Sequence, residues 1–278
     1  MTIPPAPARC GPLSDGRIRV FAHSDTRFSY CLFVPAPDRG AQPGGLVVAI
    51  HDSERNFMEC CDGLAAFGEK HRRAVLAPLF PGNVLGDGNC DGYKYLFEAG
   101  IRYDLLLNEM VDAVARATGC DASRFCLHGY SGGAQFAHRY LVLHPGRVLA
   151  ASVGAPGEVT LLDPEADWWA GVRDIDALFG LPLDLPALRR VPVQLLVGDL
   201  DTQTEDLEPS PPSRYWRSDG ERITANRIDR LWALERSLAE AGVTVQFELM
   251  PGVEHSAGAA AARTLAQRFF STRIGQRP

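Results

Sequence analysis

The sequence lacks the features that mark several large classes of protein. Among its 278 residues there is no apolar run of about 18 residues, the length that a membrane-spanning helix requires. Its Lys and Arg residues are scattered and the net charge is −6, which argues against a nucleic-acid partner. The first ten residues show no charged start followed by an apolar core. We therefore expect a cytoplasmic protein with no export signal and no membrane partner.

The sequence also lacks the spacing of a metal site. Its seven cysteines include no C-x-x-C pair, and an odd set of this kind is typical of reduced thiols in a cytoplasmic protein. A zinc site needs four ligands at recognisable spacing, and none is found. The Asp and Asn residues of 81–95 do not follow an EF-hand pattern, so turn formation explains them better than calcium binding. We expect no metal and no cofactor.

What the sequence does contain is a regular alternation of strand-like and helix-like segments. The hydrophobic fraction of 46% is typical of a globular protein, and the length fits one domain, 1–278. Eight segments predict strands: 17–22, 28–34, 46–50, 74–80, 125–128, 148–153, 193–197 and 243–249. Helical periodicity is found in 57–71, 103–114, 136–144, 228–241 and 257–270. This order predicts an α/β fold with a mostly parallel eight-stranded sheet and helices on both faces.

Two stretches interrupt this alternation. Residues 155–190 contain several prolines and a pair of tryptophans, and we expect a small cap-like insertion there. Residues 202–222 are rich in proline and charge and have no periodicity, which predicts a mobile surface loop.

The most specific motif is Gly129-Tyr130-Ser131-Gly132-Gly133, which directly follows an expected strand. A G-x-S-x-G turn between a buried strand and a helix holds its serine in a strained conformation and exposes the hydroxyl above the sheet. A glycine-rich turn without function is the simpler explanation of such a pentapeptide. The interpretation of Ser131 as a nucleophile therefore depends on partners elsewhere in the chain.

A serine nucleophile requires a histidine to accept its proton and an acid to orient that histidine. In open α/β sheets, functional residues follow the carboxyl ends of strands. His255 follows the last expected strand, and Asp199 and Asp201 both follow the strand before it. We predict His255 as the general base and favour Asp201 as the acid, because Asp199 could instead serve in a turn. The resulting order Ser, Asp, His is the one that G-x-S-x-G folds use.

The negative charge that develops on an attacked carbonyl oxygen needs N–H donors. Gly132, at the start of a helix, is one expected donor to this oxyanion hole, and we favour the backbone N–H of Ser53 as the other. Alternatively, Ser53 or Asn56 merely caps the helix that follows.

Several aromatic side chains lie near the expected strand ends, where a cleft should form. They could line an acyl or aromatic pocket, and they could equally pack a cap. The candidate substrate-binding residues are Tyr93, Tyr95, Trp168, Trp169, Tyr130 and His51.

These motifs resemble the α/β-hydrolase superfamily, and within it small serine esterases of the polyhydroxyalkanoate depolymerase and feruloyl esterase type. Residues 198–201 resemble the G-x-x-D acid loop and residues 251–255 the histidine loop. His51 matches the first residue of the His-Gly oxyanion motif, but Asp52 stands where that motif has Gly. A Gly there usually allows a positive φ, which Asp adopts at some cost. The resemblance spans 46–270 and implies an α/β-hydrolase fold.

The sequence thus predicts a serine hydrolase that cleaves a small-molecule carboxylic ester through an acyl-enzyme intermediate. A thioesterase, a peptidase or an acyltransferase would use the same residues, and the sequence does not separate these activities. A catalytically silent binding protein on the same fold is a further alternative, which Asp52 alone favours. The natural substrate and the oligomeric state, including a homodimer, are left open.

Overall fold

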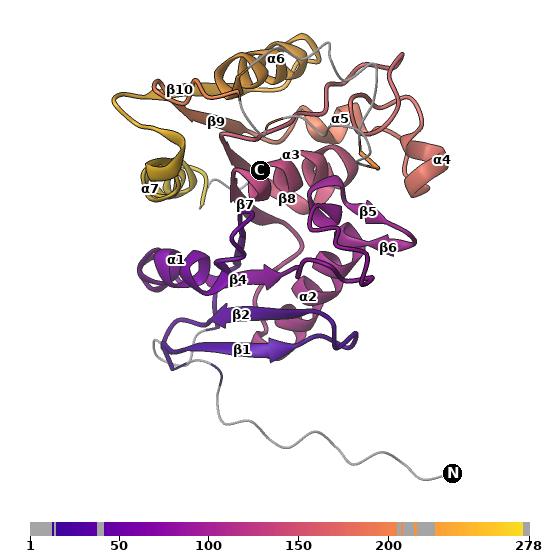
Figure 1. Cartoon of the computed structure of the whole chain (residues 1–278). Helices are drawn as coiled ribbons and strands as arrows, with labels where there is room; N and C mark the ends of the chain where they lie inside the picture. Colours follow the sequence, from indigo (N-terminus) through magenta and orange to yellow (C-terminus); the bar gives the residue numbers. More distant parts are fainter. Residues whose placement is uncertain are drawn as a thin grey trace, which may run out of the picture.

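An eight-stranded sheet forms the centre of the molecule (Figure 1). The computed structural model describes residues 13, 15–37, 42–204, 207, 214–215 and 226–274. The strands are β1 (Ile18–Ala22), β2 (Ser29–Phe33), β3 (Leu46–Ile50), β4 (Ala74–Leu79), β7 (Phe125–Tyr130), β8 (Val148–Gly154), β9 (Val193–Gly198) and β10 (Val245–Met250). They lie in the order β1-β2-β4-β3-β7-β8-β9-β10. Strand β2 is antiparallel to β1 and β4, and every other neighbouring pair is parallel, so the predicted mostly parallel sheet is confirmed.

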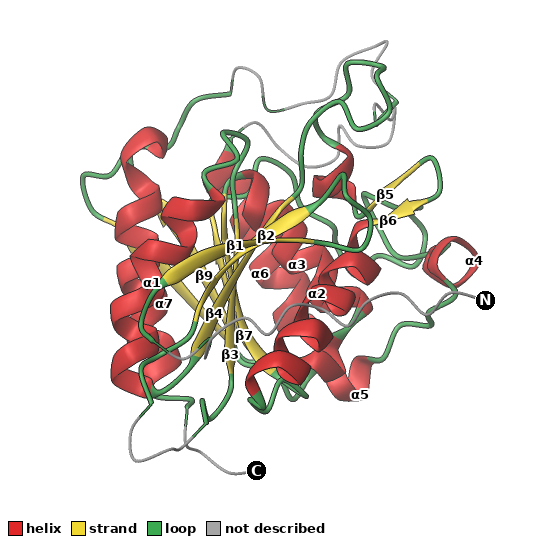
Figure 2. Cartoon of the chain, turned by 90° about the horizontal axis from the view of Figure 1, so that it is seen from below, coloured by secondary structure: helices red, strands yellow, loops and turns green. Residues whose placement is uncertain are grey.

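Helices cover both faces of this sheet, as predicted (Figure 2). The long helices are α1 (Phe57–His71), α2 (Tyr103–Thr118), α3 (Gly132–Leu143), α6 (Arg227–Glu240) and α7 (Gly258–Ser271). Helices α1 and α7 lie together on one face, and their apolar side chains form one core with β3 and β4. Helices α2, α3 and α6 contribute to the larger core on the other face. Within the described ranges, no helix is both long and apolar enough to cross a bilayer.

Shorter elements lie in the connections. They are the 3-10 helices η1 (Gly92–Tyr95), η2 (Pro145–Arg147) and η4 (His255–Ala257), the strands β5 (Phe97–Glu98) and β6 (Ile101–Arg102), and the helices α4 (Ile175–Phe179) and α5 (Leu185–Leu188). The β5–β6 pair was not expected, because two strands of two residues carry no periodicity that a sequence pattern can reveal.

The expected insertion, 155–190, contains α4 and α5 joined by turns. It packs against η1, because the indole N–H of Trp168 donates to the Tyr95 carbonyl at 3.0 Å. Its role as a cap stays a prediction. Most of the expected mobile loop, 202–222, lies outside the described residues, and its mobility also stays a prediction.

Two fully buried histidines are tied into the fold through both ring nitrogens. In His51, Nδ1 donates to the Asp52 carbonyl at 2.7 Å, and Nε2 accepts from the Phe80 N–H at 3.0 Å. In His138, Nδ1 donates to the Ala134 carbonyl at 2.8 Å, and Nε2 accepts from the Thr160 N–H at 2.9 Å. An acceptor nitrogen must keep its lone pair, so both rings are neutral. Burial lowers the pKa of His51 to about 4 and that of His138 to about 3.

These two histidines predict a loss of stability in mild acid. Below pH 6.5 the histidines of the unfolded chain bind protons, whereas the buried rings of the folded protein stay neutral. The free energy of unfolding therefore decreases as the pH is lowered, until the pKa of the folded state is reached. Each ring should lower the free energy of unfolding by about 1.4 kcal/mol per pH unit in that window. Urea unfolding at pH 7 and pH 5 measures the effect. The His138→Gln variant, whose side chain does not titrate, should show a smaller decrease; an equal decrease would contradict this account.

Candidate active site

The turn between β7 and α3 carries Ser131 in a strained conformation. Its φ of 51° and ψ of −118° lie in a region that residues with a Cβ rarely adopt. The neighbouring strand holds the turn, because the Ser131 N–H donates to the Gly154 carbonyl at the end of β8 at 2.8 Å. The Ser131 carbonyl accepts from the Gln135 N–H at 3.1 Å and so starts α3. This is the geometry that the G-x-S-x-G pattern predicts.

The two glycines that flank this turn leave no space for a side chain. A Cβ on Gly129 would lie 2.1 Å from the Gly133 carbonyl oxygen, and a Cβ on Gly133 would lie 2.3 Å from the Ile50 carbonyl oxygen. Both neighbours are backbone atoms, which cannot turn aside. The glycines therefore allow the start of α3 to approach the ends of β3 and β7 closely.

Three polar side chains from three strand ends meet at this turn. His255 Nε2 lies 3.1 Å from Ser131 Oγ, and His255 Nδ1 lies 2.7 Å from Asp201 Oδ2. Ser131 follows β7, Asp201 follows β9, and His255 follows β10, all at the carboxyl edge of the sheet. Asp201 is 1% exposed, whereas the side chain of His255 is 24% exposed. A buried acid thus orients an imidazole that solvent can reach.

The two aspartates after β9 have different partners. Asp199 is exposed, and its Oδ1 accepts from the Gly252 N–H at 2.7 Å. This bond holds the turn that leads from β10 to His255. Asp201, two residues later, is the carboxylate that contacts the imidazole. The structure therefore places the favoured acid beside His255 and gives Asp199 a role in the loop.

Tyr130 lies behind the imidazole. Its hydroxyl donates to the His255 carbonyl at 2.9 Å, and its ring stacks on the imidazole with centroids 5.3 Å apart. A Cβ on Gly258 would overlap the Tyr130 hydroxyl, so this glycine lets α7 begin directly beside the ring. The position favours a role in holding His255 over the predicted contact with substrate.

The two expected oxyanion donors lie next to each other. Gly132 is the first residue of α3, where backbone N–H groups have no partner within the helix. The Ser53 hydroxyl lies 3.1 Å from the point that a Cβ on Gly132 would occupy, so the loop after β3 borders the turn. Within the described part of the chain, neither of these two N–H groups donates to a carbonyl oxygen.

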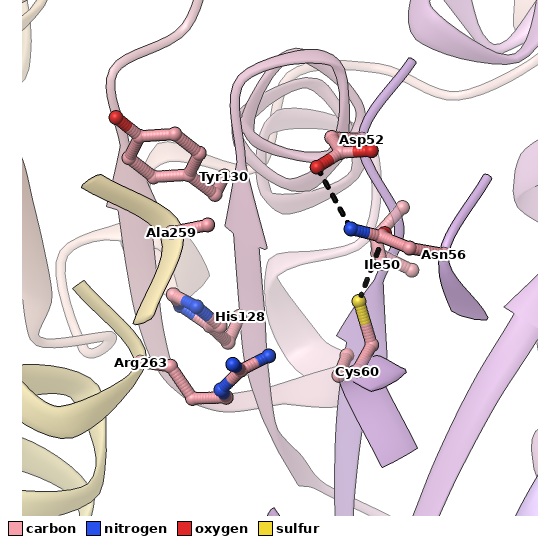
Figure 3. A pocket seen from close by; sticks show the side chains of 9 residues that line it. Ile50, Asp52, Asn56, Cys60, His128, Tyr130, Ala259 and Arg263 are labelled. Carbon is pink, nitrogen blue, oxygen red and sulfur yellow. Dashed lines mark hydrogen bonds between the residues drawn. The ribbon is translucent and has the colours of Figure 1, made fainter. Parts of the chain in front are cut away.

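The carboxylate of Asp52 is used within its own loop. Its Oδ1 accepts from the Glu54 N–H at 2.9 Å, and its Oδ2 accepts from the Asn56 amide at 3.0 Å (Figure 3). The positive φ in this loop falls at Arg55, at 59°, so Asp52 is free of the backbone strain that was expected for it. Asp52 also lines a cavity of about 20 Å³, which has room for about one water molecule. Its other walls include His128, Cys60 and Arg263 (Figure 3).

Comparison with protein-family models and with curated proteins gave no match. Solved structures, however, match nearly the whole chain. LpqC, a poly(3-hydroxybutyrate) depolymerase from Bordetella parapertussis, superposes with a TM-score of 0.70 at 22% identity, covering 92% of this chain and 89% of that chain. Poly(aspartic acid) hydrolase-1 from Sphingomonas sp. KT-1 has a TM-score of 0.68 at 20% identity, covering 87% and 92%. A ferulic acid esterase has a TM-score of 0.61 at 18% identity, covering 93% and 98%.

The chain has the α/β-hydrolase fold. The resemblance that the motifs indicated is thereby confirmed at the level of the fold, which serine hydrolases and esterases share. Among the described residues of this α/β-hydrolase fold, no group of three or more His, Cys, Asp or Glu side chains could hold a metal ion.

His51 lies in the core of the α/β-hydrolase fold and is held there by hydrogen bonds. It is fully buried, and its hydrogen bonds tie the end of β3 to Phe80 at the end of β4. Both ring nitrogens are occupied by the protein itself. This arrangement favours a structural role over the predicted contact with substrate.

The aromatic residues near the insertion are also buried. Tyr95, Trp168 and Trp169 are each less than 9% exposed, and the indole N–H of Trp169 donates to the Tyr215 carbonyl at 2.8 Å. The ring of Tyr95 stacks on that of Tyr215 with centroids 3.9 Å apart. Of the two explanations that the sequence left open, this packing favours the cap.

Arg227 is a site residue that sequence reasoning missed. It is the first residue of α6, and its Nη1 lies 3.0 Å from Asp201 Oδ1, the carboxylate oxygen that does not contact His255. Its side chain is 13% exposed. This ion pair fixes the plane of the carboxylate. No sequence signal could have found Arg227, because it lies 26 residues after Asp201 in the chain.

The close approach at Gly133 predicts a steep cost for one methyl group. Gly133→Ala places its Cβ 2.3 Å from a backbone oxygen, so α3 or β3 must shift, and we expect a loss of about 1–3 kcal/mol in the free energy of unfolding. Gly146→Ala is the control, because nothing lies within 4 Å of its Cβ. Urea unfolding of both variants measures the difference. Equal stability of the two variants would contradict the close approach.

Proposed function

We propose that the protein is a serine hydrolase that cleaves a small-molecule carboxylic ester through an acyl-enzyme intermediate. The observation that carries the proposal is the hydrogen-bonded chain from Ser131 through His255 to Asp201. A serine hydroxyl is a weak nucleophile, and an oriented imidazole within hydrogen-bonding distance is what activates it. The α/β-hydrolase fold supports the proposal, because this fold carries such residues in the same chain order.

In the proposed reaction, Ser131 Oγ attacks the ester carbonyl carbon while His255 Nε2 takes the hydroxyl proton. Asp201 orients the imidazole through Nδ1–H and stabilises the imidazolium that forms. Collapse of the tetrahedral intermediate breaks the bond to the alcohol, which leaves with the proton from His255. Water then attacks the acyl-enzyme by the same route and restores Ser131.

The oxyanion of each tetrahedral intermediate would be held by the Gly132 and Ser53 N–H groups. The N-terminus of α3 adds the favourable end of a helix dipole at this point. Donors that are fixed before the reaction need no reorganisation when the charge develops, and each is worth about 3 kcal/mol of barrier.

A silent binding protein is less well supported than a hydrolase. Its only support was Asp52, whose charge was expected to oppose an oxyanion. Both carboxylate oxygens of Asp52 accept hydrogen bonds within the 52–56 loop. This structural role explains the presence of Asp52 in an active hydrolase. Thioester, peptide and acyl-transfer reactions would use the same residues, and no described contact separates them from ester hydrolysis.

A fluorophosphonate probe tests the proposed nucleophile. We expect the wild-type protein to be labelled on Ser131, because the probe reacts with a serine that an adjacent imidazole activates. Ser131→Ala should abolish labelling, and Ser123→Ala, which removes an exposed hydroxyl, should leave it unchanged. Mass spectrometry of the labelled peptide identifies the site. A wild-type protein that resists the probe, or labelling that survives in Ser131→Ala, would overturn the proposal.

A further inference from the structure

The hydroxyl of Tyr93 is buried and makes no well-formed hydrogen bond to the described residues, and the Ser53 hydroxyl is its polar neighbour. Tyr93 is 1% exposed and lies in η1. Among the described residues, it provides the only buried side-chain polar atom without a partner that is not an arginine nitrogen. Leaving such a group unpaired costs about 1–3 kcal/mol.

Three other buried tyrosines do have partners for their hydroxyls. The hydroxyl of Tyr103 donates to Glu98 at 2.8 Å, and that of Tyr140 donates to Asn108 at 2.6 Å. The Tyr130 hydroxyl donates to the His255 carbonyl. The packing satisfies the hydroxyls of these three rings, so the position of Tyr93 is what calls for an explanation.

That position is beside the expected oxyanion donor. A Cβ on Gly132 would meet the Tyr93 hydroxyl oxygen and, at 3.1 Å, the Ser53 hydroxyl. Gly132 directly follows Ser131, so the phenol lies at the same turn as the proposed nucleophile. The three groups, Gly132, Ser53 and Tyr93, come from three separate segments of the chain.

The ring of Tyr93 is held firmly in this place. Its centroid lies 4.8 Å from that of His51 and 6.1 Å from that of Phe80. The guanidinium of Arg55 lies 5.8 Å above the ring. Burial raises the pKa of Tyr93, so the phenol keeps its proton and acts as a donor. A fixed, protonated donor is what a developing negative charge requires.

We propose that the Tyr93 hydroxyl is a third donor to the oxyanion that forms when Ser131 attacks a substrate. The inference rests on the proposed function and deepens it. The phenol donates a hydrogen bond and keeps its proton, so the reaction balances as before.

This arrangement would act on the rate and not on substrate binding. A hydroxyl that is unpaired in the free protein and paired in the tetrahedral intermediate stabilises the intermediate selectively. If Tyr93 served only to pack the core, its hydroxyl would lower stability and contribute nothing to the rate.

The variant Tyr93→Phe separates these roles, because stability and activity should respond differently. Removing an unpaired hydroxyl should leave the free energy of unfolding unchanged or higher. The kcat for p-nitrophenyl acetate should fall by about 10²-fold, the effect of losing one oxyanion donor. The KM should stay within about twofold, because the lost interaction is absent in the ground state. Affinity for an alkyl trifluoromethyl ketone, which forms a tetrahedral adduct with serine, should fall by the same factor as kcat.

Tyr140→Phe is the matched control. Its hydroxyl is paired with Asn108 at 2.6 Å, two turns along α3 from the site, so this variant should lose about 1 kcal/mol of stability and keep its turnover. An unchanged kcat in Tyr93→Phe would overturn the inference, as would a loss of kcat that follows a loss of stability. Failure of the wild-type protein to turn over any ester, with Ser131 unlabelled by the fluorophosphonate, would overturn the proposed function itself and this inference with it.

Discussion

The close contact of the start of α3 with the ends of β3, β7 and β8 is the constraint on which the rest of the site depends. Gly133 touches the carbonyl of Ile50, and Ser131 is tied to Gly154. These contacts hold Ser131 at a φ that it would not adopt alone. They also bring the N-terminus of α3 beside Ser53, where an anion would be stabilised. Backbone packing, which no side chain can replace, thus sets the direction of the serine hydroxyl.

The loops after β9 and β10 supply the acid and the histidine of the site. Asp199 holds the turn before His255 and Asp201 holds the imidazole, so one short loop serves both the position of the histidine and its orientation. Arg227 then fixes Asp201 from the other side, and Tyr130 packs behind the ring. The imidazole has little freedom in this arrangement, and such preorganisation is what proton transfer in an acyl-transfer site requires.

The strands, the serine turn and the grouping of Ser131, Asp201 and His255 could be predicted from the sequence, because each depends on local pattern and on which edge of a parallel sheet a loop leaves. The surroundings of these residues could not. The sequence around Tyr130 or His51 is compatible with a side chain that faces a substrate and with one that faces the core. Only tertiary packing decides between these two orientations. Arg227 and Tyr93 lie far along the chain from their neighbours, and an unpaired hydroxyl has no signature in a sequence.

The central claim is that three strand ends bring a serine, an imidazole and one particular carboxylate together for proton transfer. Turnover of p-nitrophenyl acetate by Asp201→Asn and Asp199→Asn tests it most directly, because the two aspartates are two residues apart and differ in their partners. The account predicts that Asp201→Asn lowers kcat by about 10⁴-fold, as expected when the imidazole loses its orienting acid. Asp199→Asn should keep most of the activity. The reverse pattern, or equal losses in both variants, would contradict the account.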